Sequence, residues 1–208
     1  MNYLVNNFNV VVELFLQHLQ MTLTVIFFSL FIGIPLGVLL ARIRWLRGPV
    51  MSILGVIYTI PSLSFFVLLI PLFGLGTRPA IIALTAYAQL LLIRNWLVGL
   101  TTIDPAILEA ARGMGLNGWQ RFWQIEFPLA LPMLLAGVRL VALSSIGIGT
   151  IAAFINAGGL GVLLFQGVIT ANYDKIFTGA LAVTVLSFTA NYFIRFLERR
   201  AELRIHGE

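Results

Sequence analysis

Long apolar runs alternate with short polar segments along this chain of 208 residues. A helix rises about 1.5 Å per residue, so roughly 20 apolar residues are needed to cross about 30 Å of hydrocarbon. Five runs reach that length, at residues 22–41, 50–73, 80–100, 132–155 and 177–197. The pattern predicts an all-α integral membrane protein with five transmembrane helices, forming one domain over residues 1–208.

The first 20 residues have a different pattern, in which apolar and polar positions are mixed. They contain no Lys or Arg, so they lack the basic region of a signal peptide. Their apolar residues fall near one stripe of a helix, which predicts a helix lying at the membrane surface before the first span. His18 in this segment is interpreted as a surface residue.

The composition agrees with a membrane protein. Hydrophobic residues make up 60% of the chain and charged residues 10%, with a mean hydropathy of +0.99. Soluble domains carry about 25% charged residues, so a soluble domain is excluded. The absence of cysteine excludes disulfides and thiolate metal sites, and the two histidines, His18 and His206, are far apart in the sequence. We therefore expect no metal site.

The basic residues are unevenly distributed between the two sets of loops. If the N-terminus lies outside, the inner segments hold nine of them: Arg42, Arg44, Arg47, Arg112, Arg121, Arg195, Arg199, Arg200 and Arg204. The outer segments hold only Arg78 and Lys175, and Arg94 and Arg139 lie within spans. Because basic residues concentrate on the cytoplasmic side, we predict the N-terminus outside, the C-terminus inside and residues 101–131 in the cytoplasm.

The loop at residues 101–131 has its own helix signals. Asp104 can cap a helix N-terminus and Pro105 suits the first helical turn, so a helix is expected to begin there. Gly113 and Gly115 are expected to end it. Asn117 predicts a second short helix through Trp123, with Pro128 and Pro132 leading into the fourth span.

The spacing in this loop resembles the EAA motif of ATP-binding-cassette (ABC) importer permeases. That motif reads E-A-A, three residues, G, nine residues, I, one residue, L-P. Its counterparts here are Glu109-Ala110-Ala111, Gly115, Ile125 and Phe127-Pro128, with Phe127 in place of the usual Leu. The segments IPLGVLLAR, IPSLSFF, LIRNWLVGL and GTIAAFINAGGLG extend the resemblance over nearly the whole chain, toward the permeases of osmoprotectant importers.

The resemblance implies a type I ABC importer permease in a bacterial-type cytoplasmic membrane, taking up glycine betaine, carnitine, choline or a similar compound. An amino acid or another small polar solute is the alternative. The implied partners are ATPase subunits that carry ATP and Mg, a second permease subunit (the same chain or a homologous one) and an extracytoplasmic substrate-binding protein. No cofactor on this chain and no nucleic-acid partner is implied. The first helix of the loop would dock into the ATPase through Asp104, Pro105, Glu109, Ala110, Ala111, Arg112 and Gly115.

The chain has no ATPase signature of its own. The pattern G-x-x-x-x-G-K-[ST] is absent, so hydrolysis is expected on another polypeptide. A stand-alone secondary transporter is a second hypothesis, but no span carries an acid near its centre and five spans do not divide into equal repeats. An integral-membrane enzyme is a third, and it lacks a cluster of His, Cys or acidic residues.

Candidates for a translocation path follow from polar, aromatic and kinked positions in the spans. Pro61 can break the second span, and an aromatic face such as Tyr58 or Phe154 can hold a quaternary amine. The full set is Tyr58, Pro61, Ser62, Ser144, Thr150, Phe154 and Asn156. Arg94 and Arg139 are interpreted as anchors that reach the cytoplasmic edge or pair with an inner acid such as Glu126.

Overall fold

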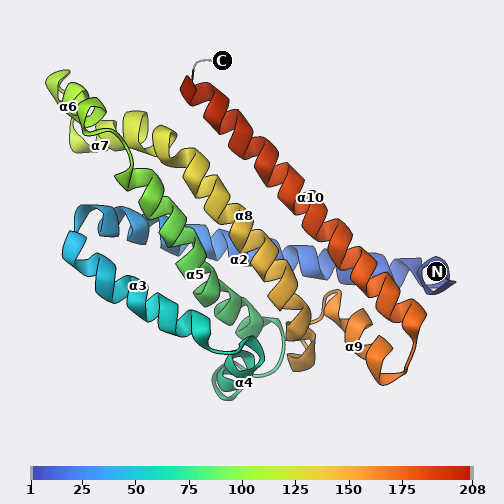
Figure 1. The fold of residues 1–208 in the computed structure, drawn as a ribbon. Helices are drawn as coiled ribbons and strands as arrows, with labels where there is room; N and C mark the ends of the chain where they lie inside the picture. The colour runs from blue at the N-terminus through green and yellow to red at the C-terminus, as the bar shows by residue number, and fades with distance from the viewer. Residues whose placement is uncertain (1, 207–208) are drawn as a thin grey trace.

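The computed structural model describes residues 2–206, and all regular structure within them is helical (Figure 1). The α-helices are α1 (Asn2–Asn6), α2 (Phe8–Arg42), α3 (Arg44–Thr59), α4 (Ser62–Phe73), α5 (Thr77–Thr101), α6 (Pro105–Gly113), α7 (Gly118–Arg121), α8 (Phe127–Ile151), α9 (Gly161–Ile169) and α10 (Tyr173–His206). A π-helix, η1 (Phe122–Glu126), joins α7 to α8, and a 3-10 helix, η2 (Ala152–Ile155), extends α8.

Four helical stretches are long and apolar enough to cross a membrane: Phe8–Arg42, Thr77–Thr101, Gly118–Ile155 and Tyr173–Leu203. The predicted second span, 50–73, is not one helix. It is divided into α3 and α4, which meet at 96° and make a fifth span only if they are counted together. Pro61 lies at this break, where its ring and missing N–H favour an end to the helix.

The N-terminal region also differs from the prediction. No break separates residues 8–20 from the first span, because α2 is continuous over 35 residues. At about 1.5 Å per residue it is roughly 52 Å long, well beyond the hydrocarbon thickness. Figure 1 shows it crossing α5, α8 and α10 at a steep angle. The interpretation of His18 as a surface residue is wrong, because its side chain is fully buried.

Close approach of small residues packs the long helices together. Gly33 and Gly37 of α2 lie against Leu92 and Trp96 of α5, and a Cβ atom at Gly33 would lie 2.7 Å from Leu92 Cδ2. On its other side α5 packs on α8, where a Cβ atom at Gly99 would lie 3.0 Å from the Ala130 carbonyl. Small residues allow such contacts where no hydrophobic effect drives helices together.

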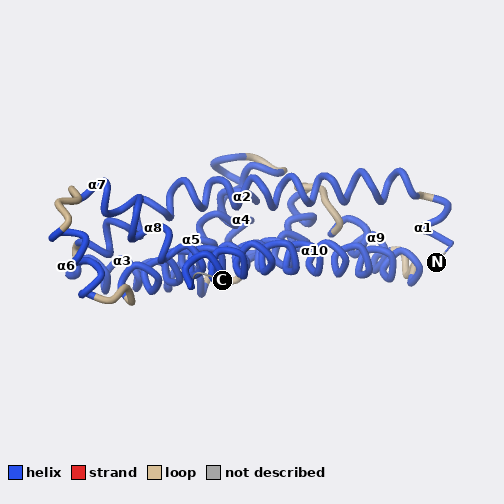
Figure 2. The backbone as a smooth tube through the Cα atoms, turned by 90° about the horizontal axis from the view of Figure 1, so that it is seen from above, coloured by secondary structure: helices blue, strands red, loops and turns tan. Residues whose placement is uncertain are grey.

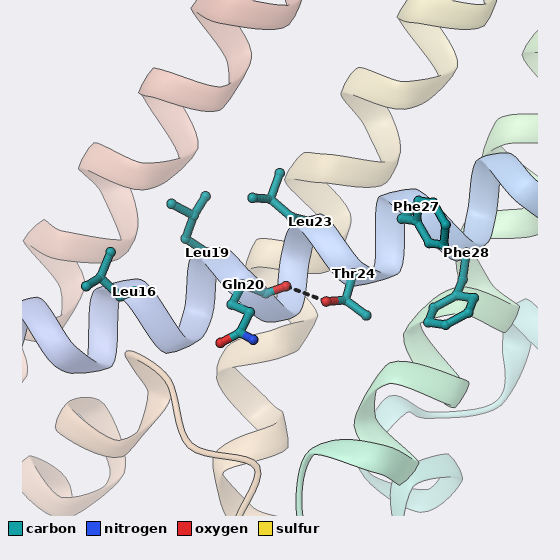
Figure 3. A pocket seen from close by; sticks show the side chains of 7 residues that line it. All are labelled: Leu16, Leu19, Gln20, Leu23, Thr24, Phe27 and Phe28. Carbon is teal, nitrogen blue, oxygen red and sulfur yellow. Dashed lines mark hydrogen bonds between the residues drawn. The ribbon is translucent and has the colours of Figure 1, made fainter.

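The outward surface of α2 is apolar. Large side chains line a shallow hollow on it, including Leu16, Leu23 and Phe27 (Figure 3). The Thr24 hydroxyl in this hollow donates to the Gln20 carbonyl at 2.8 Å. A threonine satisfied within its own helix can face hydrocarbon, so this surface is suited to lipid.

The loops collect at two opposite ends of the bundle. Figures 1 and 2 show α6 and α7 at one extremity and α1 and α9 at the other. At the first end, Phe127 and Pro128 line one hollow with Leu197 and Arg200 of α10. At the second, the Tyr3 amide donates to Asp174 at the start of α10. The short segments between the long helices therefore gather at two opposite ends of the bundle.

Candidate functional site

The helix α6 begins and ends where its sequence signals indicate. The Asp104 carboxylate accepts from the Ala106 amide at 2.9 Å, and Pro105 occupies the first turn. At the other end, the Leu116 amide donates to the Ala111 carbonyl at 3.2 Å. Gly115 has φ +79°, a left-handed conformation that favours glycine. The predicted helix with its N-terminal cap and glycine stop is confirmed.

The two adjacent alanines of the E-A-A sequence, Ala110 and Ala111, face opposite environments. Ala111 is 1% exposed, so it is covered by its own chain and has no surface to offer a partner. Glu109, Ala110 and Arg112 are exposed. Figure 1 places α6 at the tip of the molecule, away from the long helices. The structure thus presents one small residue between two charged ones on an accessible, capped helix.

The second half of the loop is more continuous than predicted. Asn117 and Gln120 form a reciprocal capping box that starts α7. The helix does not end at Trp123 but passes through η1 into α8, and the Phe127 amide donates to the Phe122 carbonyl five residues back. This π-turn lets the helix continue through the irregular backbone before Pro128, so the loop runs without a break into the fourth span.

Glu126, in that π-turn, joins three elements. Its side chain lies 2.5 Å from Arg42 Nη2 at the end of α2 and 2.8 Å from Arg121 Nε in α7, and the residue is 5% exposed. Of the two roles expected for Arg94, reaching the cytoplasmic edge or pairing with an inner acid, the structure does not show the pairing with Glu126: the ion pairs of Glu126 are with Arg42 and Arg121, and Arg94 is exposed on α5. A buried carboxylate held by two guanidinium groups fixes the loop to the bundle.

Arg139 behaves as expected of an anchor. It lies on α8 with its Nε 3.3 Å from Glu198 Oε2 on α10. Both side chains are partly buried, so the pair fastens α10 to α8 on the side where α10 approaches the loop.

The path candidates form two groups. Tyr58, Pro61 and Ser62 surround the break between α3 and α4, where the Tyr87 hydroxyl donates to the Ile60 carbonyl at 2.6 Å. The second group, on α8 and just beyond it, consists of Ser144, Thr150, Phe154 and Asn156. The helix α4 packs on η2, the element that carries Phe154. Tyr58 is 38% exposed and Phe154 57% exposed, so both rings remain accessible.

Asn156 differs from the other candidates in its backbone. It has φ +62° and lines a cavity of about 500 Å³ with Gln17, Gln20 and Thr77. The Thr150 hydroxyl instead bonds within its own helix, where it donates to the Gly147 carbonyl at 2.8 Å. Sequence reasoning missed Tyr87 and Gln17, since neither lies in a motif and both bond to residues distant in sequence.

Residues 33–203 match the family described as binding-protein-dependent transport system inner membrane components. The chain belongs to this family. It is accordingly a multi-pass inner membrane protein, a permease subunit with the fold of the ABC importer permeases and not an enzyme. In such transporters ATP is hydrolysed by a separate ATPase subunit.

Curated relatives of this permease have related transport roles. The osmoprotectant import permease protein OsmW of Salmonella typhimurium is 36% identical, covering 95% of this chain and 94% of its own. The carnitine transport permease protein OpuCB of Listeria monocytogenes is also 36% identical, covering 94% of this chain and 89% of its own. Among solved structures, an inward-facing MetNI methionine ABC transporter gives a TM-score of 0.81 at 27% identity, covering 89% of this chain and 93% of that one.

The Glu126 cluster of this permease predicts a specific loss of stability. Arg121→Ala leaves the buried carboxylate with Arg42 alone. Removing one partner of a buried pair costs about 3–5 kcal/mol, and roughly 1–3 kcal/mol is expected here because the second guanidinium remains. Thermal unfolding of the detergent-solubilised protein should show a lower midpoint. Arg44→Ala is the control, because it removes an exposed arginine two residues after Arg42, beside the end of α2. Equal midpoints for both variants would contradict the role given to Glu126.

Proposed function

We propose that this permease subunit forms the path for a small quaternary ammonium osmoprotectant, such as glycine betaine, carnitine or choline. The main support is sequence similarity: this chain is 36% identical, over nearly its full length, to an osmoprotectant permease and to a carnitine permease. The methionine transporter is less similar, at 27% identity, which favours the osmoprotectants over an amino acid. The accessible rings of Tyr58 and Phe154 support a cationic substrate, because aromatic faces attract quaternary amines.

The proposed orientation has the N-terminus outside and the loop at residues 101–131 in the cytoplasm, with five spans when α3 and α4 count as one. The arginine distribution supports it, since Arg42, Arg112 and Arg121 belong to the end that carries α6. In this cysteine-free chain, Asn117→Cys should react with a membrane-impermeant thiol reagent only in inverted vesicles. Labelling from the outer face would refute the orientation.

The proposed docking element for the ATPase is α6. Glu109 and Arg112 offer charges of both signs, and Ala110 between them permits close approach. Ala111 has a different role, holding α6 against its own loop. Asp104, Pro105 and Gly115 fix where the helix begins and where the chain turns. ATP and Mg would be bound by that separate ATPase.

A complete importer on this proposal contains two permease subunits and an extracytoplasmic binding protein. One chain provides too few spans to enclose a path for a charged solute. The second subunit is another copy of this chain or a homologous one. A purified complex with a single permease chain per two ATPase subunits would contradict this arrangement.

The backbone at Gly115 provides a test of the docking role. A Cβ atom added at Gly113 or at Gly115 would meet no other atom within 4 Å, but only Gly115 has a left-handed φ. Gly115→Val should therefore misdirect α6 while Gly113→Val should not. We expect Gly115→Val to lose most transport and ATPase co-purification at near-normal membrane levels. Gly115→Asn, which tolerates this conformation, should recover both. Full coupling in Gly115→Val would make α6 a passive surface element.

Uptake in cells lacking other osmoprotectant importers tests the substrate. Expression of this chain with its ATPase and binding protein should give ATP-dependent accumulation of labelled glycine betaine, carnitine or choline. Methionine in excess should not compete. Accumulation of methionine alone would assign the permease to amino acids, and accumulation without the ATPase would indicate a secondary transporter.

A further inference from the structure

The chain leaves helical geometry in a tight turn at residues 156–160, between η2 and α9. Three left-handed positions make this turn possible: φ is +62° at Asn156, +79° at Gly158 and +76° at Gly159. Gly161, which follows, lies so close to the Thr150 carbonyl that no side chain would fit. The Gly159 and Leu160 amides lie in the turn just before α9, outside any helical ladder, so they need acceptors from elsewhere.

Two adjacent side chains of α2 supply those acceptors. Gln17 Oε1 accepts from the Gly159 amide at 3.1 Å, and His18 Nδ1 accepts from the Leu160 amide at 3.3 Å. Both glycines make room for them. A Cβ atom at Gly158 would lie 2.6 Å from Gln17 Oε1, and one at Gly159 would lie 2.9 Å from His18 Nδ1. The turn is therefore built around this pair.

The bonds of His18 determine its protonation state. Its second nitrogen, Nε2, lies 3.1 Å from the Ile146 carbonyl of α8, an acceptor, so Nε2 must carry the proton. Nδ1 must then be unprotonated to accept from Leu160. Only the neutral ring makes both bonds. The imidazolium would place Nδ1–H against the Leu160 N–H, two donors facing each other.

The segments around the ring offer no charge that would compensate a protonated His18. Residues 140–173, which include the turn, α9 and this end of α8, contain no Asp, Glu, Lys or Arg. Along α2 the nearest acid is the exposed Glu13, which accepts from Gln17 Nε2 at 3.2 Å. Asp174 and Lys175, at the start of α10, interact with Tyr3.

We propose that Gln17 and His18 are positioning residues that hold the 156–160 turn closed against α2, and that protonation of His18 releases it. The turn is also tied to α5, because the Gly76 amide donates to the Ile155 carbonyl at 2.7 Å. It forms one wall of the cavity of about 500 Å³ that Asn156 and Gln17 share. Release of the turn opens this polar cavity at the end of the bundle opposite α6. The proposal rests on the proposed function only in placing that end outside.

Thiol labelling of the complete transporter in right-side-out vesicles tests the proposal. Ala157 is 8% exposed, so Ala157→Cys reports opening of the turn. Thr170→Cys, exposed beyond α9, reports general access and the intrinsic reactivity of the reagent. The measured quantity is the labelling rate of Ala157→Cys divided by the labelling rate of Thr170→Cys. If Thr170→Cys reacts only in inverted vesicles, the orientation is wrong, and the same ratio is measured there.

The replacements at position 18 separate hydrogen bonding from packing. His18→Leu removes both bonds and should raise the ratio about tenfold, the effect of losing a buried hydrogen bond. His18→Gln can still donate once and accept once, so its ratio should stay near that of the unmodified sequence. Gln17→Leu, at an exposed position, should raise the ratio without disturbing the interior.

The pH profile tests the release. Lowering the pH from about 8 to about 5 should raise the ratio with His18 present and leave it unchanged in His18→Gln, because the glutamine side chain does not titrate. An unchanged ratio with His18 present over this range would overturn the release. An unchanged ratio in both His18→Leu and Gln17→Leu would overturn the closing role. A pH response that persists in His18→Gln would overturn the release by His18.

Discussion

Hydrocarbon offers no hydrogen-bond partners, so backbone that leaves helical geometry at membrane depth must find them within the protein. The same solution recurs where this chain is irregular. The Tyr87 hydroxyl donates to the Ile60 carbonyl at the break before Pro61. Gln17 and His18 do the equivalent for amides of the 156–160 turn. Polar side chains of neighbouring helices thus allow interruptions in an otherwise continuous helical bundle.

One helix, α2, makes polar contacts at both ends of the bundle. Near its start it holds the 156–160 turn, and at its last residue Arg42 binds Glu126 beside the loop that carries α6. Glu126 also binds Arg121, and its own π-turn continues into α8. On the proposed docking role, a displacement of α6 would reach α2 and α8 by way of α7, because Arg121 of α7 and Arg42 of α2 both bind Glu126.

Local signals in the sequence predicted the parts of the structure that depend on them. Apolar runs located the long helices, and Asp104 with Gly115 located the limits of α6. Partners distant in sequence could not be predicted. His18 lies in a mixed polar segment, and its burial depends on Ile146, 128 residues away. Proline was ambiguous, because Pro35 and Pro71 lie inside intact helices whereas Pro61 lies at a break of 96°. At the Pro61 break the Tyr87 hydroxyl bonds the Ile60 carbonyl, a contact between residues distant in sequence that no local signal predicts.

The central claim is that α6 is the contact through which the ATPase acts on this permease. Cross-linking of single cysteines to the ATPase subunit in the assembled transporter tests it most directly, since the chain has no cysteine of its own. Cross-links should form from positions 109, 110 and 112, which are exposed, and not from position 111, which is buried. Cross-links from the C-terminal half of α10 with none from α6 would contradict the account.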